Sequence, residues 1–127
     1  MSTEEKVAQK FLHKEGVFQI EAMSNLRSKT TGVVGVVIWI SAGEFSGSDL
    51  QHGPRIKVVL GDKINKEGLK NAVSVTIAAS PKVIGVLPAR IKKEVLAFIN
   101  NNRDTLLAHW NGELDASEAI AQLNKVE

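Results

Sequence analysis

The feature that most constrains the fold is an uninterrupted apolar run from Val33 to Ile40, Val-Val-Gly-Val-Val-Ile-Trp-Ile. Its residues are apolar at odd and even positions and mostly β-branched, which is typical of a strand buried on both faces. The run is far too short to span a bilayer. A strand of this kind needs a paired neighbour on each side and cover on each face. We therefore expect residues 33–40 to form the central strand of a sheet.

Three further segments alternate between apolar and polar residues, as half-buried strands do: Val17–Ala22, Arg55–Leu60 and Ala72–Ala79. Residues 61–71 are polar and predict no more than a helical turn. Consecutive strands with short connections favour an antiparallel sheet. In the segment 55–60 the alternation predicts that Leu60 faces the core.

Helices are expected at both ends of the chain. Ser2 and Glu5 have the spacing of a capping box and predict a short first helix. Pro88 suits the first position of a helix, and an apolar stripe then keeps one face as far as Trp110, which predicts one long helix ending at Asn111–Gly112. A second capping-box spacing, Asp115–Glu118, predicts a short last helix. The predicted fold is α+β, with about four mainly antiparallel strands packed on the long C-terminal helix.

Composition limits what the chain can be. Its 127 residues predict a single domain over residues 1–127. The absence of cysteine excludes disulfides and thiolate metal sites and fits a reducing cytosol, so we expect a cytoplasmic protein. We also expect no cofactor. The net charge of +2 is too small for strong general attraction to nucleic acid.

The longest polar loop, residues 43–54, is punctuated by glycine and lies between two predicted strands. Functional side chains gather on loops of this kind because the strands hold them in place. The loop contains Glu44, Phe45, Ser46, Ser48, Asp49 and His52.

This loop admits a catalytic, a metal-binding and a simpler interpretation. His52 is the one candidate for a catalytic base, which Glu44 or Asp49 could orient and a nearby serine could use. The same three residues could in principle hold zinc or manganese, but no second histidine lies nearby and we expect no metal site. The simpler interpretation is a solvated polar loop. Phe45 is an isolated aromatic residue that either anchors a partner or plugs the core.

The strand after the loop carries Arg55 and Lys57 on its predicted outward face. Arg27 and Lys29 could lie on a neighbouring strand, and the group would then form a basic patch for a phosphate backbone. The chain has few aromatic residues outside core positions, which disfavours base stacking.

Two stretches of the second half are similar to a known family. His52-Gly-Pro-Arg-Ile-Lys-Val58 resembles the His-Pro-Pro-His-Val-His-Val strand of a widespread small prokaryotic domain family of unknown function. Leu87-Pro-Ala-Arg90 and the segment 102–113, which includes Trp110-Asn-Gly-Glu113, resemble its C-terminal helix. The resemblance implies a small intracellular module, often encoded beside a partner in gene pairs of toxin–antitoxin type. Arg55 and Lys57 replace the family's later histidines, so His52 alone carries over.

The sequence therefore favours a non-catalytic binding or regulatory module over an enzyme. We expect it to act through protein–protein interaction at residues 43–57, with Phe45 as the apolar anchor. The polar contacts would come from Glu44, Asp49, His52, Arg55 and Lys57. One alternative is a ribonuclease-like toxin or nucleic-acid-binding protein that uses His52, Arg55 and Lys57. A further alternative is a phage-encoded inhibitor of host defence. A homodimer is also expected, because one helix layer covers only one face of the sheet.

Overall fold

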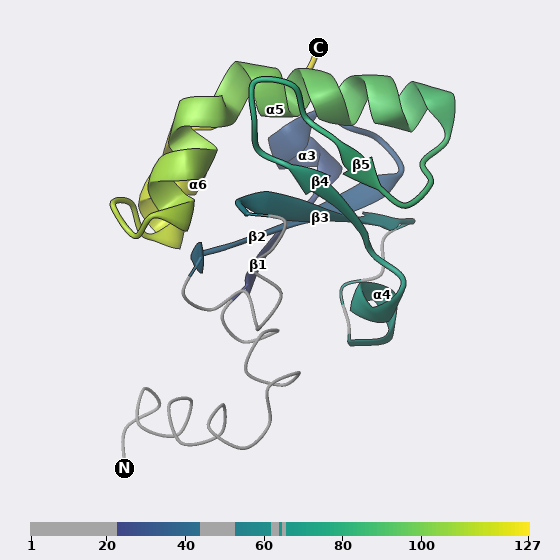
Figure 1. The fold of residues 1–127 in the computed structure, drawn as a ribbon, viewed down its shortest axis with the longest axis horizontal. Coiled ribbons are helices and arrows are strands. Elements are labelled where there is room, and N and C mark those ends of the chain that lie inside the picture. Colours follow the sequence, from purple (N-terminus) through teal and green to yellow (C-terminus); the bar gives the residue numbers. More distant parts are fainter. Residues whose placement is uncertain (1–22, 44–52, 62–63, 65) are drawn as a thin grey trace.

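The structure is a computed structural model that describes residues 23–43, 53–61, 64 and 66–127. Within these residues, five strands form one antiparallel sheet in which every strand pairs with the next along the chain (Figure 1). The strands are β1 (Met23–Leu26), β2 (Val36–Ser41), β3 (Arg55–Leu60), β4 (Val73–Thr76) and β5 (Val83–Ile84). The helices are α3 (Ser28–Thr31), α4 (Lys66–Lys70), α5 (Ala89–Trp110) and α6 (Ala116–Gln122). The predicted α+β class, antiparallel sheet and long C-terminal helix are confirmed.

The strand count and some boundaries differ from the prediction. The sequence did not predict β1 and β5, whereas the predicted strand 17–22 and the first helix lie outside the described residues. β2 begins at Val36 and not at Val33, because Gly35 turns the chain with φ +91°. The Gly35 carbonyl then accepts a hydrogen bond from the Gly61 N–H at 2.7 Å, which joins the start of β2 to the end of β3.

The main core lies between the sheet and α5, which crosses one face of the sheet in Figure 1. The sheet contributes Ile38, Ile40, Ile56, Val58 and Val75, and α5 contributes Ile91, Val95, Phe98, Ile99 and Leu106. Leu60 was predicted to face this core, but it is 46% exposed. It is the last residue of β3 and lies beyond Val58–Val73, the final pair that β3 forms with β4.

The opposite face of the sheet holds a second buried cluster of Val37, Trp39 and Val59. β2 is therefore buried on both faces, as its sequence predicts. The homodimer was expected because this second face would need cover from another chain. These side chains are already buried within one chain, so the face gives no reason for self-association, and the homodimer stays a prediction.

The long helix is bent. Asn102 has φ −127° and ψ 16°, outside helical values, and in Figure 1 α5 turns downward after its first half and continues beside α6. Pro88 is the N-cap residue and not the first helical residue. The predicted last helix is confirmed with its capping box, in which Asp115 accepts from the Glu118 N–H at 2.8 Å and Glu118 from the Asp115 N–H at 2.9 Å. In the described part of the chain, no helix combines the length and the apolar character that crossing a membrane requires.

Candidate functional site

The structure describes the two ends of the predicted recognition loop. The chain leaves β2 through Ala42 and Gly43 and returns through Gly53 and Pro54 to β3. The predicted binding residues Glu44, Phe45, Asp49 and His52 lie outside the described residues. The described part of the site is therefore its base, which includes Arg55 and Lys57.

The first end of the loop, Gly43, lies against the indole of Trp110. An ideal Cβ placed on Gly43 would come within 2.5 Å of Trp110 Nε1 and 2.7 Å of Cε2. A real Cβ does not approach another heavy atom so closely, so the contact as it stands requires glycine. Trp110 is the last residue of α5, and the bend at Asn102 gives the second half of the helix its own direction toward this end of the sheet (Figure 1).

The second end of the loop lies against the same indole through Arg55. The guanidinium carbon of Arg55 is 5.7 Å from the centroid of the Trp110 ring, within the range of a cation–π interaction. Arg55 Nη1 also donates a hydrogen bond to the Gly53 carbonyl at 3.1 Å. The side chain is only 5% exposed. The prediction that Arg55 faces solvent is therefore wrong, and its guanidinium group lies against the Trp110 ring instead.

Lys57 lies on the same face of β3 as Arg55, as the alternation predicts. It pairs across the sheet with Ser74, and its Nζ donates to Ser74 Oγ at 3.2 Å. The side chain is half-buried. Arg27 precedes α3 and Lys29 belongs to it, so neither residue extends the group from a neighbouring strand as the sequence suggested.

A single indole therefore contacts both ends of the loop. Gly43 and Arg55 are brought together at Trp110, although the sequence separates Trp110 from both by a long distance. Buried cation–π contacts and close packing of a large aromatic ring both oppose local opening of the chain. This arrangement fixes where the loop leaves and re-enters the sheet.

Ionisable groups in the described part of the chain do not gather into a metal site, since no group of three or more His, Cys, Asp or Glu side chains lies close enough together to hold an ion. His109 is buried beside the end of α5, and its Nδ1 is 2.9 Å from the Leu114 carbonyl. A carbonyl accepts only, so Nδ1 carries the proton and donates. The Nε2 atom has no hydrogen-bond partner among the described residues. We assign His109 a role in closing the turn between α5 and α6.

Trp110 and Gly43 are the functional candidates that the sequence did not identify. The apolar stripe of the long helix accounts for Trp110, and Gly43 stands out only as a loop glycine. A tryptophan near a helix end and a glycine at a strand end are each common in sequences, and only the fold shows that these two residues are in contact.

No family model, no curated protein and no solved structure matches this chain.

Proposed function

We propose that this protein is a non-catalytic binding module that recognises another protein through the loop of residues 43–57. The observation that supports the proposal is the contact of Trp110 with both Gly43 and Arg55. A loop whose two ends are held in place loses less conformational entropy when it binds than a loop with free ends. The fold thus provides the rigid base that a recognition loop needs.

In this proposal the loop residues divide by role. Phe45 provides apolar contact area, and Glu44, Asp49 and His52 provide polar contacts, as expected for an interface with one aromatic anchor and a polar surround. Arg55 belongs to the base of the loop and not to its contact surface, because it is buried against Trp110.

The nucleic-acid and ribonuclease alternatives receive less support. Both need Arg55 and Lys57 to reach a phosphate, and phosphate contacts come from cationic groups at the surface. Arg55 is 5% exposed, and Lys57 donates to Ser74 across the sheet. The arrangement at β3 therefore favours a protein partner.

Affinity capture with matched variants tests the proposal. The wild-type chain is compared with Phe45→Ala, Asp49→Ala and a control, Lys125→Ala, which changes an exposed side chain of the C-terminal segment. We expect one stoichiometric protein partner to be captured by wild type and by Lys125→Ala and to be lost with both loop variants. The melting temperatures of all four proteins should agree, which would show that binding and not folding was lost.

Two further results would count against the proposal. Equal capture of the partner by both loop variants would remove residues 43–57 from the interface. Strong absorbance at 260 nm in the eluate would point to nucleic acid, since the chain has two tryptophans and no tyrosine and contributes little there. Light scattering of the purified chain would separately test the predicted homodimer.

A further inference from the structure

We infer that the outer edge of β5, together with the segment 82–86, is a docking site for an extended acidic segment of a partner protein. This site lies on β5, whereas the loop of residues 43–57 connects β2 to β3. The inference does not depend on the function proposed for that loop. The segment would add a further strand to the sheet beside β5 and place carboxylates near Lys82 and Lys92.

The backbone of β5 is open on its outer side. Thr76 N–H donates to the Lys82 carbonyl at 3.0 Å, and Lys82 N–H donates to Thr76 Oγ1 at 2.8 Å. The next pairs in register are Val75–Val83 and Ser74–Ile84. Since bonded and non-bonded pairs alternate along an antiparallel ladder, the N–H and C=O groups of Val83 point away from β4. Among the described residues, none of the hydrogen bonds outside the helices and strand ladders uses these two groups.

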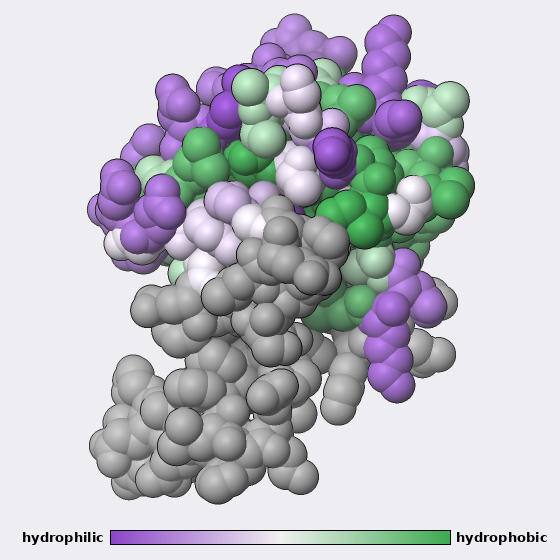
Figure 2. Space-filling view, in the orientation of Figure 1, coloured by the Kyte–Doolittle hydropathy of each residue, from purple (hydrophilic) through white to green (hydrophobic). Residues whose placement is uncertain are grey.

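Apolar side chains accompany this open edge. Val86 is 84% exposed and Ile84 is 36% exposed, both high values for large apolar residues. An open depression of about 430 Å³ lies beside them, with Lys82, Val83, Gly85 and Val86 among its lining residues. Figure 2 shows green, apolar side chains gathered on the right-hand side of the molecule, the side on which α5 begins in Figure 1. An extended segment could place alternate apolar residues against this surface.

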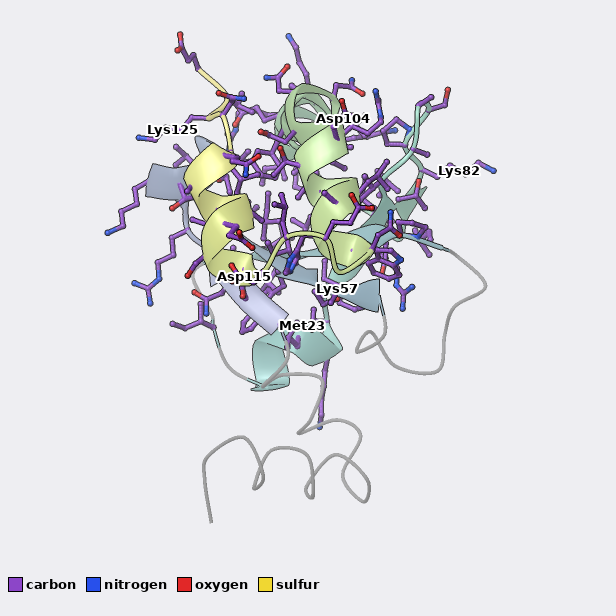
Figure 3. All side chains as sticks on the ribbon, turned by 90° about the vertical axis from the view of Figure 1, so that its left-hand side faces the viewer. Met23, Lys57, Lys82, Asp104, Asp115 and Lys125 are labelled. Carbon is purple, nitrogen blue, oxygen red and sulfur yellow. The ribbon has the colours of Figure 1, made fainter. Side chains whose placement is uncertain are left out.

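Charge identifies the kind of partner. Lys82 and Lys92 both line the depression and both are exposed, and none of its lining residues is acidic. Figure 3 shows Lys82 extending away from the body of the molecule. Carboxylates on the incoming segment would complement these lysines and would orient it along the edge.

A second copy of this chain fits the site less well. Antiparallel pairing of two β5 edges through the outward groups of Val83 would place Lys82 of each chain opposite Ile84 of the other, and the two Lys82 side chains would be diagonal neighbours on one face. Long side chains of like charge reach each other across this diagonal, and their repulsion disfavours the pairing. The lysines at the edge thus act against self-association. An acidic partner segment is therefore the occupant that the edge favours.

The site is short, so its side-chain contacts matter. β5 has only two residues, and Gly85 ends it with φ +128°. A Cβ on Gly85 would lie 3.2 Å from both Val73 Cγ atoms, so the chain passes close to β4 at this point. Few backbone hydrogen bonds are available on such an edge, and the lysines and Val86 must provide the specificity.

Two synthetic peptides of opposite charge provide the probe. Acetyl-(Glu-Val)₃-amide and acetyl-(Lys-Val)₃-amide have the same alternation and differ in the sign of their charge. Each is titrated to millimolar concentration into the ¹⁵N-labelled full chain, and amide chemical shifts are recorded. We expect saturable shifts at residues 82–86 with the acidic peptide and none with the basic peptide.

Charge-reversal variants make the result decisive. The double variant Lys82→Glu/Lys92→Glu changes two exposed side chains and should keep the fold. It should bind the acidic peptide at least tenfold more weakly and should now bind the basic peptide. The variant Val83→Pro removes the outward N–H and should weaken binding without changing which peptide is preferred.

Several outcomes would overturn the inference. These are no saturable shifts with the acidic peptide, shifts mapped to other residues, or unchanged affinity after charge reversal. The Phe45→Ala variant should bind the acidic peptide as wild type does. Loss of the loop function and loss of the edge site can therefore be told apart.

Discussion

The side-chain amide of Asn102, at the bend of α5, forms two hydrogen bonds with the backbone of Asn124 in the C-terminal segment. Asn102 Nδ2 donates to the Asn124 carbonyl at 2.9 Å, and Asn102 Oδ1 accepts from the Asn124 N–H at 2.7 Å. Nδ2 also donates to the Phe98 carbonyl at 2.9 Å. Asn102 is 2% exposed. One side chain thus connects the bend of the helix to the docking of the C-terminal segment.

Replacing this side chain should destabilise the fold measurably. We expect Asn102→Ala to lower the free energy of unfolding by about 2 kcal/mol, because it removes buried hydrogen bonds and leaves backbone groups of Asn124 without their partners. Asn101→Ala is the control, since it removes the same side-chain amide from the neighbouring, exposed position of the same helix. Urea denaturation followed by circular dichroism measures both. Equal stability of the two variants would contradict a structural role for the pair.

Gly32 holds the same C-terminal segment from another side. It has φ +82°, and a Cβ on it would overlap the backbone of Val126, whose N–H donates to the Thr31 carbonyl at 2.8 Å. Gly112 has nearly the same φ, +81°, but a Cβ on it would meet no atom within 4 Å beyond its chain neighbours. The two glycines therefore have nearly the same φ but differ in their steric surroundings.

Substituting alanine at each position separates these two effects. Gly112→Ala should cost about 1 kcal/mol, the strain of a left-handed alanine. Gly32→Ala should cost about 2 kcal/mol more, because the added methyl group displaces Val126. Thermal and urea unfolding of both variants give the comparison. In a chain shortened to end at Asn124 the two costs should become equal, and equal costs in the full chain would show that Val126 does not pack on Gly32.

The sequence predicted the elements whose signals are local. Alternation predicted the strand Arg55–Leu60 with its observed bounds, the apolar stripe predicted the helix up to Trp110, and capping chemistry predicted α6. β5 was missed because its two residues, Val83 and Ile84, are too few to show a periodic pattern. The bend at Asn102 was missed because Asn102 bonds to Asn124 in a distant segment, which no local pattern reveals.

The candidate site was predicted only in part, because its local features left a pattern in the sequence and its contacts between distant residues did not. Alternation placed Arg55 and Lys57 on one face of β3, which the register supports. It could not predict that Arg55 is buried, because the group that covers it, Trp110, comes from a distant helix. Alternation reports the two faces of a strand, whereas burial depends on what packs there.

The contact of Gly43 with Trp110 can be tested by nuclear magnetic resonance. The chain has two tryptophans, so its ¹⁵N spectrum should contain two indole N–H signals. Gly43→Ala should shift the Trp110 signal, because the added Cβ would lie 2.5 Å from Trp110 Nε1. The Trp39 signal should stay in place and serves as an internal control, since Trp39 belongs to the separate buried cluster with Val37 and Val59. An unmoved Trp110 signal would mean that Gly43 does not touch the ring.

The contact of Arg55 with Trp110 calls for a double-mutant cycle built from Arg55→Met and Trp110→Leu, substitutions that keep apolar bulk. We expect a coupling of about 1–2 kcal/mol in the free energy of unfolding, because the guanidinium group is largely removed from water. The Arg90–Glu94 pair is the reference, an ion pair one helical turn apart whose side chains are 57% and 27% exposed. Its coupling should be about 0.3–0.5 kcal/mol.

Salt distinguishes these two pairs further. Screening acts on exposed charges, so about 1 M salt should remove the Arg90–Glu94 coupling and leave most of the Arg55–Trp110 coupling. A coupling for Arg55 and Trp110 no larger than that of the reference pair would mean that the ring and the guanidinium are merely adjacent. Trp110 would then fix only the Gly43 end of the loop, and the rigid base on which the proposed recognition surface depends would lose one of its two attachments.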